Sequence, residues 1–158
     1  SALAPSVAKV GVFVDEDKSK VLDIAEDCEL DMLQFHGDED PGYCGSFMSS
    51  YKIIKAFRVK DKNSLKGINN YDVDFYMLDT YSEKSKGGTG KSFDWNIIED
   101  FEFLKPVILS GGLAPENVVH AIQRFLPYGV DVSSGVEEAP GKKDLELMRK
   151  FVENVRKG

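Results

Sequence analysis

The stretch Val107-Ile108-Leu109-Ser110-Gly111-Gly112-Leu113-Ala114-Pro115-Glu116-Asn117 decides the fold class. It starts with a short apolar run, as buried strands do, and continues through a glycine pair. It then reaches Pro115, a residue type favoured at the first position of a helix. The residues that follow have the apolar spacing of a helix, at Val118, Ala121, Ile122 and Phe125. The sequence therefore predicts one strand, loop and helix unit here.

The same unit recurs along the chain. Strands are predicted at Val10–Val14, Met32–Phe35, Ile53–Phe57, Phe75–Asp79, Val107–Ser110 and Gly129–Ser133. These runs are apolar on both faces, as buried parallel strands are, and segments of helical spacing separate them. The alternation predicts an α/β fold with a parallel sheet, either open and doubly wound or closed as a (βα)8 TIM barrel. A complete barrel needs at least about 200 residues, so 158 residues correspond to six βα units in one domain, 1–158.

Composition and charge exclude several partners. The chain has 27 acidic and 20 basic residues and a net charge of -7, which disfavours binding to nucleic acid or anionic lipid. No apolar run approaches the roughly 18 residues that span a bilayer, and Ser1–Pro5 does not resemble a signal peptide. We therefore expect a cytoplasmic protein without membrane partners. Cys28 and Cys44 lack metal-binding spacing, so we expect reduced thiols and no metal.

Polar and glycine residues gather where the predicted strands end. The segments in question are His36-Gly37, Asp79-Thr80, Ser110-Gly111-Gly112 and Ser133-Ser134-Gly135. The carboxyl ends of parallel strands share one edge of the sheet, and that edge carries the active site in both parallel architectures. The sequence therefore predicts that these segments meet in one site.

Asp79 is the candidate catalytic residue. It closes a strand of Phe, Tyr, Met and Leu, and apolar surroundings favour the protonated carboxyl that a general acid needs. A helix cap or a loop-bracing carboxylate is the structural alternative. His36 is a candidate ligand or proton shuttle, or else a buried structural histidine. Lys55 lies mid-strand, where its side chain could reach the barrel interior.

Two turns are candidate phosphate sites. Gly111 and Gly112 precede a predicted helix start, and Ser133-Ser134-Gly135 follows the next strand. Backbone N–H groups at such positions bind phosphate, and barrels often carry paired phosphate sites after their last two strands. Ordinary tight turns are the alternative.

The segment Ser85–Ser92, S-K-G-G-T-G-K-S, invites comparison with a nucleotide-binding P-loop. That motif requires glycine at position 85, where this chain has serine, so an NTPase is a weak alternative. The surrounding loop, Ser82–Lys91, follows Asp79 closely, and we expect it to act as a lid over that strand end.

These residues, in this order, resemble the phosphoribosylanthranilate isomerase family from Val10 to Lys157. The matching segments are 33–39, 78–80, 87–95, 109–113, 115–118, 131–137 and 140–144. The resemblance implies a TIM barrel in which this chain supplies family strands three to eight. It also implies an Amadori rearrangement in tryptophan biosynthesis, converting N-(5-phosphoribosyl)anthranilate to 1-(2-carboxyphenylamino)-1-deoxyribulose 5-phosphate without cofactor or metal.

The resemblance also implies residue roles. Asp79 would be the general acid, His36 a substrate-binding residue, and Asp131 would shape the last strand end. Gly111, Gly112, Ser133, Ser134 and Gly135 would hold the substrate phosphate. The family's base, a cysteine in a Lys-(Ile/Val)-Cys-Gly motif, and its carboxylate-binding arginine motif are not found in the 158 residues.

Three further interpretations stay open. One is a catalytically silent phosphosugar-binding fragment of a barrel. Another is a different phosphate-binding barrel of the tryptophan pathway, such as the tryptophan synthase α subunit or indole-glycerol-phosphate synthase. The third is a homo-oligomer, because a barrel of six units exposes the strands at Val10–Val14 and Gly129–Ser133 as edges.

Overall fold

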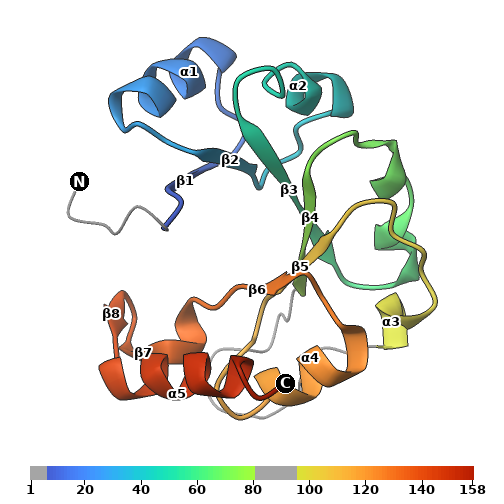
Figure 1. Ribbon diagram of the computed structural model, residues 1–158. Helices are drawn as coiled ribbons and strands as arrows, with labels where there is room; N and C mark the ends of the chain where they lie inside the picture. The colour runs from blue at the N-terminus through green and yellow to red at the C-terminus, as the bar shows by residue number, and fades with distance from the viewer. Residues whose placement is uncertain (1–6, 81–95) are drawn as a thin grey trace.

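The computed structural model describes residues 7–80 and 96–158. Six parallel strands form one sheet, in which each strand pairs with the next strand of the sequence. They are β1 (Val10–Phe13), β2 (Met32–Phe35), β3 (Lys52–Val59), β4 (Phe75–Thr80), β5 (Val107–Ser110) and β6 (Gly129–Val130). The sheet curves, and the helices lie on its outer side (Figure 1). The predicted alternation of strands and helices in a parallel α/β fold is confirmed.

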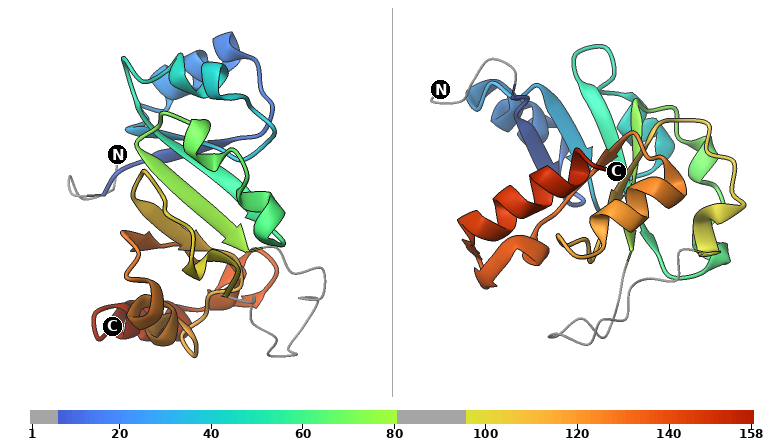
Figure 2. Two further views of the ribbon diagram at one scale, coloured as in Figure 1. Left: turned by 90° about the vertical axis from the view of Figure 1, so that its right-hand side faces the viewer. Right: turned by 60° about the horizontal axis from the view of Figure 1, so that its bottom comes forward.

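Helices and short 3-10 segments connect the strands. They are α1 (Lys18–Asp27), α2 (Pro41–Gly45), η1 (Lys62–Leu65), η2 (Ile68–Asn70), α3 (Asn96–Glu99), α4 (Val118–Phe125), η3 (Ser134–Val136) and α5 (Leu145–Val155). A small antiparallel pair, β7 (Glu137–Ala139) and β8 (Lys142–Lys143), precedes α5. The last two helices, α4 and α5, pack side by side (Figure 2). None of the described helices is long and apolar enough to cross a membrane.

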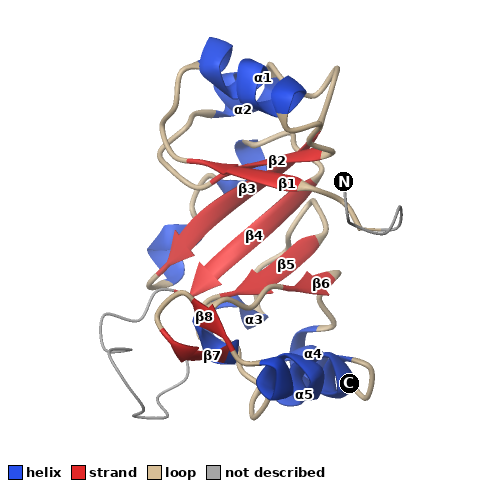
Figure 3. Ribbon diagram, turned by 90° about the vertical axis from the view of Figure 1, so that its left-hand side faces the viewer, coloured by secondary structure: helices blue, strands red, loops and turns tan. Residues whose placement is uncertain are grey.

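The two faces of the sheet bury different side chains, because successive residues of a strand point to opposite sides. The outer face packs against the helices through Leu33, Phe35, Ile53, Tyr76, Leu78 and Leu109. The inner face carries a smaller cluster of Ile54, Ala56 and Met77. Figure 3 shows the strands from the side that the helices leave open. Asp79 follows Met77 by two residues and therefore belongs to the inner face.

Several local predictions are wrong. The sixth strand was predicted as Gly129–Ser133, but β6 ends at Val130. The helix predicted to start at Pro115 begins at Val118, and Pro115 lies in the turn before it. The prediction that both faces of each strand are buried is wrong for β1, where Val12 is 59% exposed. In the described residues β1 pairs on one side only, so its inner side chains have few neighbours to cover them.

Lys55 does not reach the barrel interior. In β3 the residues that alternate with it, Ile54 and Ala56, form the inner cluster, so Lys55 points to the helix-covered face. Its ammonium nitrogen lies 5.7 Å from the centre of the Phe57 ring and 5.9 Å from that of Tyr71. The side chain is buried and paired with Glu39, as described below.

Candidate active site

The carboxyl ends of the strands surround a cleft of about 410 Å³. Its lining residues are Val12, Gln34, His36, Met77, Asp79, Ser110, Gly111, Gly112, Leu113, Asp131, Val132, Ser133, Ser134 and Gly135. This volume falls in the range of about 300–1,000 Å³ that is usual for small-molecule sites. All eight site residues predicted from the sequence lie around this one cleft, although their roles stay predictions.

Asp79 lies near the centre of this edge. It pairs in register with Arg58 of β3 on one side and with Ser110 of β5 on the other. One carboxylate oxygen, Oδ2, lies 3.1 Å from Nε2 of His36, and both side chains are about one quarter exposed. The apolar residues that flank Asp79 in sequence do not surround its carboxyl, because Tyr76 and Leu78 belong to the outer core. The carboxyl instead lines the cleft, whose walls include polar groups such as Ser110 and apolar ones such as Met77.

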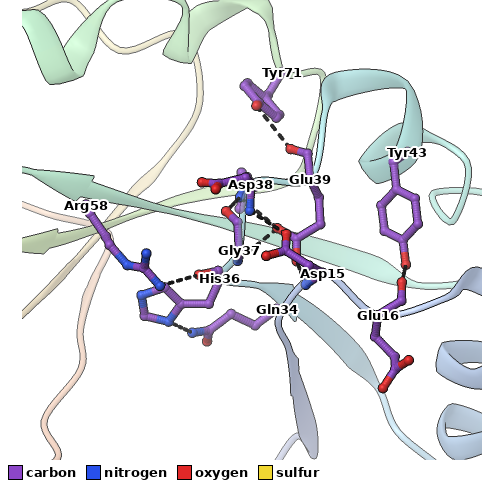
Figure 4. A network of polar contacts seen from close by, with 11 residues as sticks. Asp15, Glu16, Gln34, His36, Gly37, Asp38, Glu39, Tyr43, Arg58 and Tyr71 are labelled. Carbon is purple, nitrogen blue, oxygen red and sulfur yellow. Dashed lines mark hydrogen bonds and ion pairs between the residues drawn. The ribbon is translucent and has the colours of Figure 1, made fainter.

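His36 connects Asp79 to β2 and β3. Its second ring nitrogen, Nδ1, lies 3.4 Å from the Gln34 amide nitrogen. Its carbonyl oxygen accepts a hydrogen bond from Arg58 at 3.2 Å (Figure 4). The His36 N–H donates to the carbonyl oxygen of Phe13 at 2.8 Å. Both nitrogens of the ring therefore have polar side-chain neighbours.

The first predicted phosphate turn has an unusual backbone. Gly111 and Gly112 have φ values of 79° and 70°, a region that disfavours side chains. The Asn117 side chain holds the loop, accepting from the Ala114 N–H at 2.9 Å and donating to the Gly112 carbonyl oxygen at 2.9 Å. The glycine pair therefore turns the chain sharply between β5 and α4, at the edge of the cleft.

The second predicted turn packs against the first loop. A Cβ atom on Gly135 would lie 1.9 Å from the Leu113 carbonyl oxygen, so only glycine allows this approach. Asp131 accepts a hydrogen bond from the Ser110 hydroxyl at 2.7 Å, which joins the ends of the fifth and sixth strand segments. Ser133 is braced by Lys143, whose ammonium donates to the Ser133 carbonyl oxygen at 2.8 Å. The two turns therefore form adjoining walls of one cleft.

Sequence reasoning missed a buried ion pair beside this site. The Glu39 carboxylate and the Lys55 ammonium lie 2.9 Å apart, and each side chain is 3% exposed. Burial alone would raise the pKa of Glu39, but hydrogen bonds from the Asp15 N–H and from Lys55 outweigh it and lower that pKa. A lysine inside an apolar strand was the signal for a buried acidic partner, because buried charges are paired.

The sequence analysis also missed Gln34 and Arg58. Both residues occupy inner-face positions, Gln34 opposite Ile54 and Arg58 two residues after Ala56, which is the signal that could have located them once the register was known. In contrast, the two cysteines lie away from the cleft. Cys28 is exposed and follows the last residue of α1. Burial raises the pKa of Cys44 to about 11, which keeps it a thiol near neutral pH.

Other expectations concern a lid and metal ligands. The predicted lid, Ser82–Lys91, lies outside the described residues. Among residues 7–80 and 96–158, no three His, Cys, Asp or Glu side chains are placed to hold a metal ion.

A curved parallel sheet with polar groups gathered at its carboxyl edge defines an enzyme of the (βα)8-barrel class. The family model described as N-(5'phosphoribosyl)anthranilate (PRA) isomerase matches residues 2–154. The chain belongs to this family.

Individual relatives agree with the family match. The N-(5'-phosphoribosyl)anthranilate isomerase of Caldanaerobacter subterraneus subsp. tengcongensis is 49% identical over 98% of this chain and 75% of the relative. The crystal structure of the Thermotoga maritima isomerase matches with a TM-score of 0.88 at 38% identity, over 99% of this chain and 76% of that one. An isomerase in complex with reduced 1-(o-carboxyphenylamino)-1-deoxyribulose 5-phosphate matches with a TM-score of 0.82 at 35% identity, over 99% of this chain and 75% of that one. The chain thus spans about three quarters of the length of these relatives.

Proposed function

We propose that the cleft catalyses the Amadori rearrangement of N-(5'-phosphoribosyl)anthranilate, with Asp79 as the general acid. The observation that carries the proposal is the placement of the Asp79 and His36 pair in the same cleft as both glycine turns. A phosphorylated sugar held by its phosphate at the turns would have its ring directed toward Asp79. The complex of a related isomerase with a phosphorylated ketose analogue supports this substrate class.

Asp79 would act first. Its proton passes to the ribose ring oxygen, and the bond between that oxygen and C1 breaks while the anilino nitrogen forms a double bond to C1. Loss of the C2 proton then gives an enolamine, which tautomerises to the 2-ketone. A positioned general acid contributes about 10²–10⁴-fold to such a reaction.

The C2 proton also needs an acceptor. Cys44 is a buried thiol and Cys28 does not line the cleft. Among the described residues that line the cleft, His36 is the one histidine, and its Nε2 lies 3.1 Å from Oδ2 of Asp79. If the 158 residues alone catalyse the reaction, His36 is the first candidate for the proton acceptor. We also infer a cytoplasmic location, where this biosynthetic step would take place.

An assay of the chain with N-(5'-phosphoribosyl)anthranilate tests the proposed reaction. Formation of the ketose product, followed by chromatography and mass spectrometry, is the expected result. Binding of substrate through its phosphate with no product would instead identify a silent phosphosugar-binding protein.

Inorganic phosphate is expected to bind between the Gly111-Gly112 turn and the Ser133–Gly135 turn. Titration followed by amide NMR signals should shift Gly112 and Gly135 first. Gly135→Ala should weaken binding by at least about tenfold, or about 1.4 kcal/mol, because its Cβ would lie 1.9 Å from the Leu113 carbonyl oxygen. Gly45→Ala is the matched control, since no atom lies within 4 Å of its added Cβ. Phosphate bound elsewhere, or bound equally well by Gly135→Ala, would refute this site.

The six strands are proposed to correspond to family strands three to eight, in one domain of residues 1–158. In a closed barrel, two further βα units would stand between β1 and β6. Both strands have a hydrogen-bonded neighbour on one side only in the described part of the chain. Val10 and Val12 of β1 are 40% and 59% exposed.

We expect the chain to self-associate through these two edges, because the unpaired N–H and C=O groups of an exposed strand can pair with another chain. Light scattering should show a mass that grows with concentration in the micromolar range. Val12→Lys should reduce this growth, since a charge on an edge strand opposes pairing, whereas Val152→Lys on the exposed face of α5 should not. A monomer at all concentrations would show that the edges are protected.

A further inference from the structure

The Glu39 and Lys55 pair is the most deeply buried ion pair in the described part of the chain. Its two side chains are 3% exposed, whereas at least one partner of each other pair within residues 7–80 and 96–158 is more than 20% exposed. Neither residue lines the 410 Å³ cleft or has a role in the proposed reaction. A buried ion pair is weak support for stability, because the cost of desolvating both charges often cancels their attraction. A contribution to stability therefore does not explain why this pair is buried beside the cleft.

Both charges are directed at one short stretch of backbone. The Gly37 N–H donates to Oε2 of Glu39 at 2.9 Å, and the Lys55 ammonium donates to the Gly37 carbonyl oxygen at 2.7 Å. The other carboxylate oxygen of Glu39, Oε1, accepts from the Asp15 N–H at 2.9 Å. The pair thus ties together the segments that follow β1 and β2 and the body of β3.

Two neighbouring side chains, Arg58 and Asp15, make further hydrogen bonds to this backbone. Arg58 donates to the His36 carbonyl oxygen, which belongs to the same peptide group as the Gly37 N–H. Asp15 Oδ1 accepts from the Asp38 N–H at 2.6 Å, which belongs to the same peptide group as the Gly37 carbonyl. Figure 4 shows Asp15, Glu39 and Arg58 around the backbone of His36, Gly37 and Asp38. Two successive peptide groups are therefore held at both their N–H and their C=O.

Gly37 itself allows the approach. A Cβ atom at this position would lie 2.3 Å from Oδ1 of Asp15, so a side chain would push that carboxylate away. Charge-assisted hydrogen bonds are about twice as strong as neutral ones, and Glu39 and Lys55 make theirs from buried positions, where screening is weak. The orientation of the peptide that bears His36 is fixed accordingly.

We propose that Glu39 and Lys55 are positioning residues, which hold the His36-Gly37-Asp38 backbone so that the His36 ring keeps its contact with Asp79. The catalytic part of this proposal rests on the proposed function of Asp79 and His36. The pair itself touches neither Asp79 nor the cleft and acts through the backbone of His36.

The test removes both charges together, in Glu39→Gln/Lys55→Met. Neither charge is then left buried without its partner, so the fold should persist with a similar melting temperature. The set of hydrogen bonds from Glu39 and Lys55 to the backbone should nevertheless be lost. An amide has one acceptor oxygen and cannot accept from both the Asp15 and Gly37 N–H groups, and methionine cannot donate to the Gly37 carbonyl. The matched control is Glu29→Gln/Lys9→Met, which removes an exposed Lys–Glu pair at the opposite end of β1.

The first readout is kinetic. The double variant of the buried pair should lower kcat by about tenfold to a hundredfold, because a misplacement of about 1 Å can cost about 10²-fold. Its KM should stay within about twofold, since the proposed phosphate turns are untouched. The control pair should change neither value. A folded double variant with the kcat of the unmodified chain would overturn the proposal.

The second readout does not depend on turnover. The ring resonances of His36 in NMR spectra should shift when Asp79→Asn is introduced into the unmodified chain, and this response should vanish in the background of the double variant. A response of equal size in both backgrounds would also overturn the proposal. If Asp79→Asn leaves kcat unchanged, the proposed acid is wrong, while the resonance test still judges the positioning role. If the double variant does not fold, Arg58→Met removes another of the four contacts from an exposed position, and it should weaken the same His36 response.

Discussion

Replacement of Asp79 by asparagine is expected to lower kcat by about 10²-fold or more, the usual contribution of a positioned general acid. Asparagine has the same shape but carries no acidic proton, so the ribose ring oxygen would leave without protonation. The variant should keep its fold, because the Asp79 side chain is 27% exposed and its contact with His36 can be retained by an amide. The phosphate turns are unchanged, so KM should change little.

Steady-state kinetics of both proteins with the same substrate would measure this effect. Asp72→Asn is the matched control, because Asp72 is an exposed aspartate that pairs with Lys105 away from the cleft. Circular dichroism and the melting temperature would verify that each variant is folded. A kcat for Asp79→Asn within a few-fold of that of the unmodified chain would remove Asp79 from the mechanism.

Replacement of Phe35 by alanine is expected to reduce the free energy of unfolding by about 3–5 kcal/mol. Phe35 is fully buried on the outer face of β2. Its ring centre lies 5.0 Å from that of Phe47 and 5.3 Å from that of Tyr43. Alanine would leave a cavity between β2 and α2, and the rigid neighbours could close it only in part.

Urea unfolding at equilibrium would measure this loss. Phe35→Leu is the control, because leucine keeps most of the apolar volume and should cost less than about 1.5 kcal/mol. Since Phe35 immediately precedes His36, kcat should be compared at a temperature where both variants are folded. A loss below about 1 kcal/mol for alanine would mean that the surrounding rings collapse into the space.

The bounds of a strand could be predicted where its apolar run covers the same residues that pair in the sheet. The two coincide in β2, β4 and β5, where predicted and observed bounds agree within one residue. At Gly129–Ser133 the assigned strand ends at Val130, although the Asp131 N–H still donates to the Leu109 carbonyl oxygen and the Asp131 side chain accepts from the Ser110 hydroxyl. The helix after Pro115 starts late because the Asn117 side chain organises the preceding turn.

The candidate site was predictable where local position alone determines it. Residues that end parallel strands share an edge, so Asp79, His36 and the two turns could be grouped without coordinates. The pairing of Glu39 with Lys55 could not be derived in this way. It depends on the register that sets Phe35 opposite Lys55 and on the path of the chain after Gly37, and both are tertiary properties.

The order of the strands in the sheet has a consequence for folding. Each strand pairs with the next one in the chain, as Met32 does with Lys52 and Tyr76 with Val107. The partners in these two examples are 20 and 31 residues apart in the chain, and the entropy of closing a loop grows only slowly with its length. A chain of this kind approaches a one-dimensional array in which units are added to a formed neighbour. The central strands can thus serve as a nucleus, while the terminal units open and close around it without unfolding the whole.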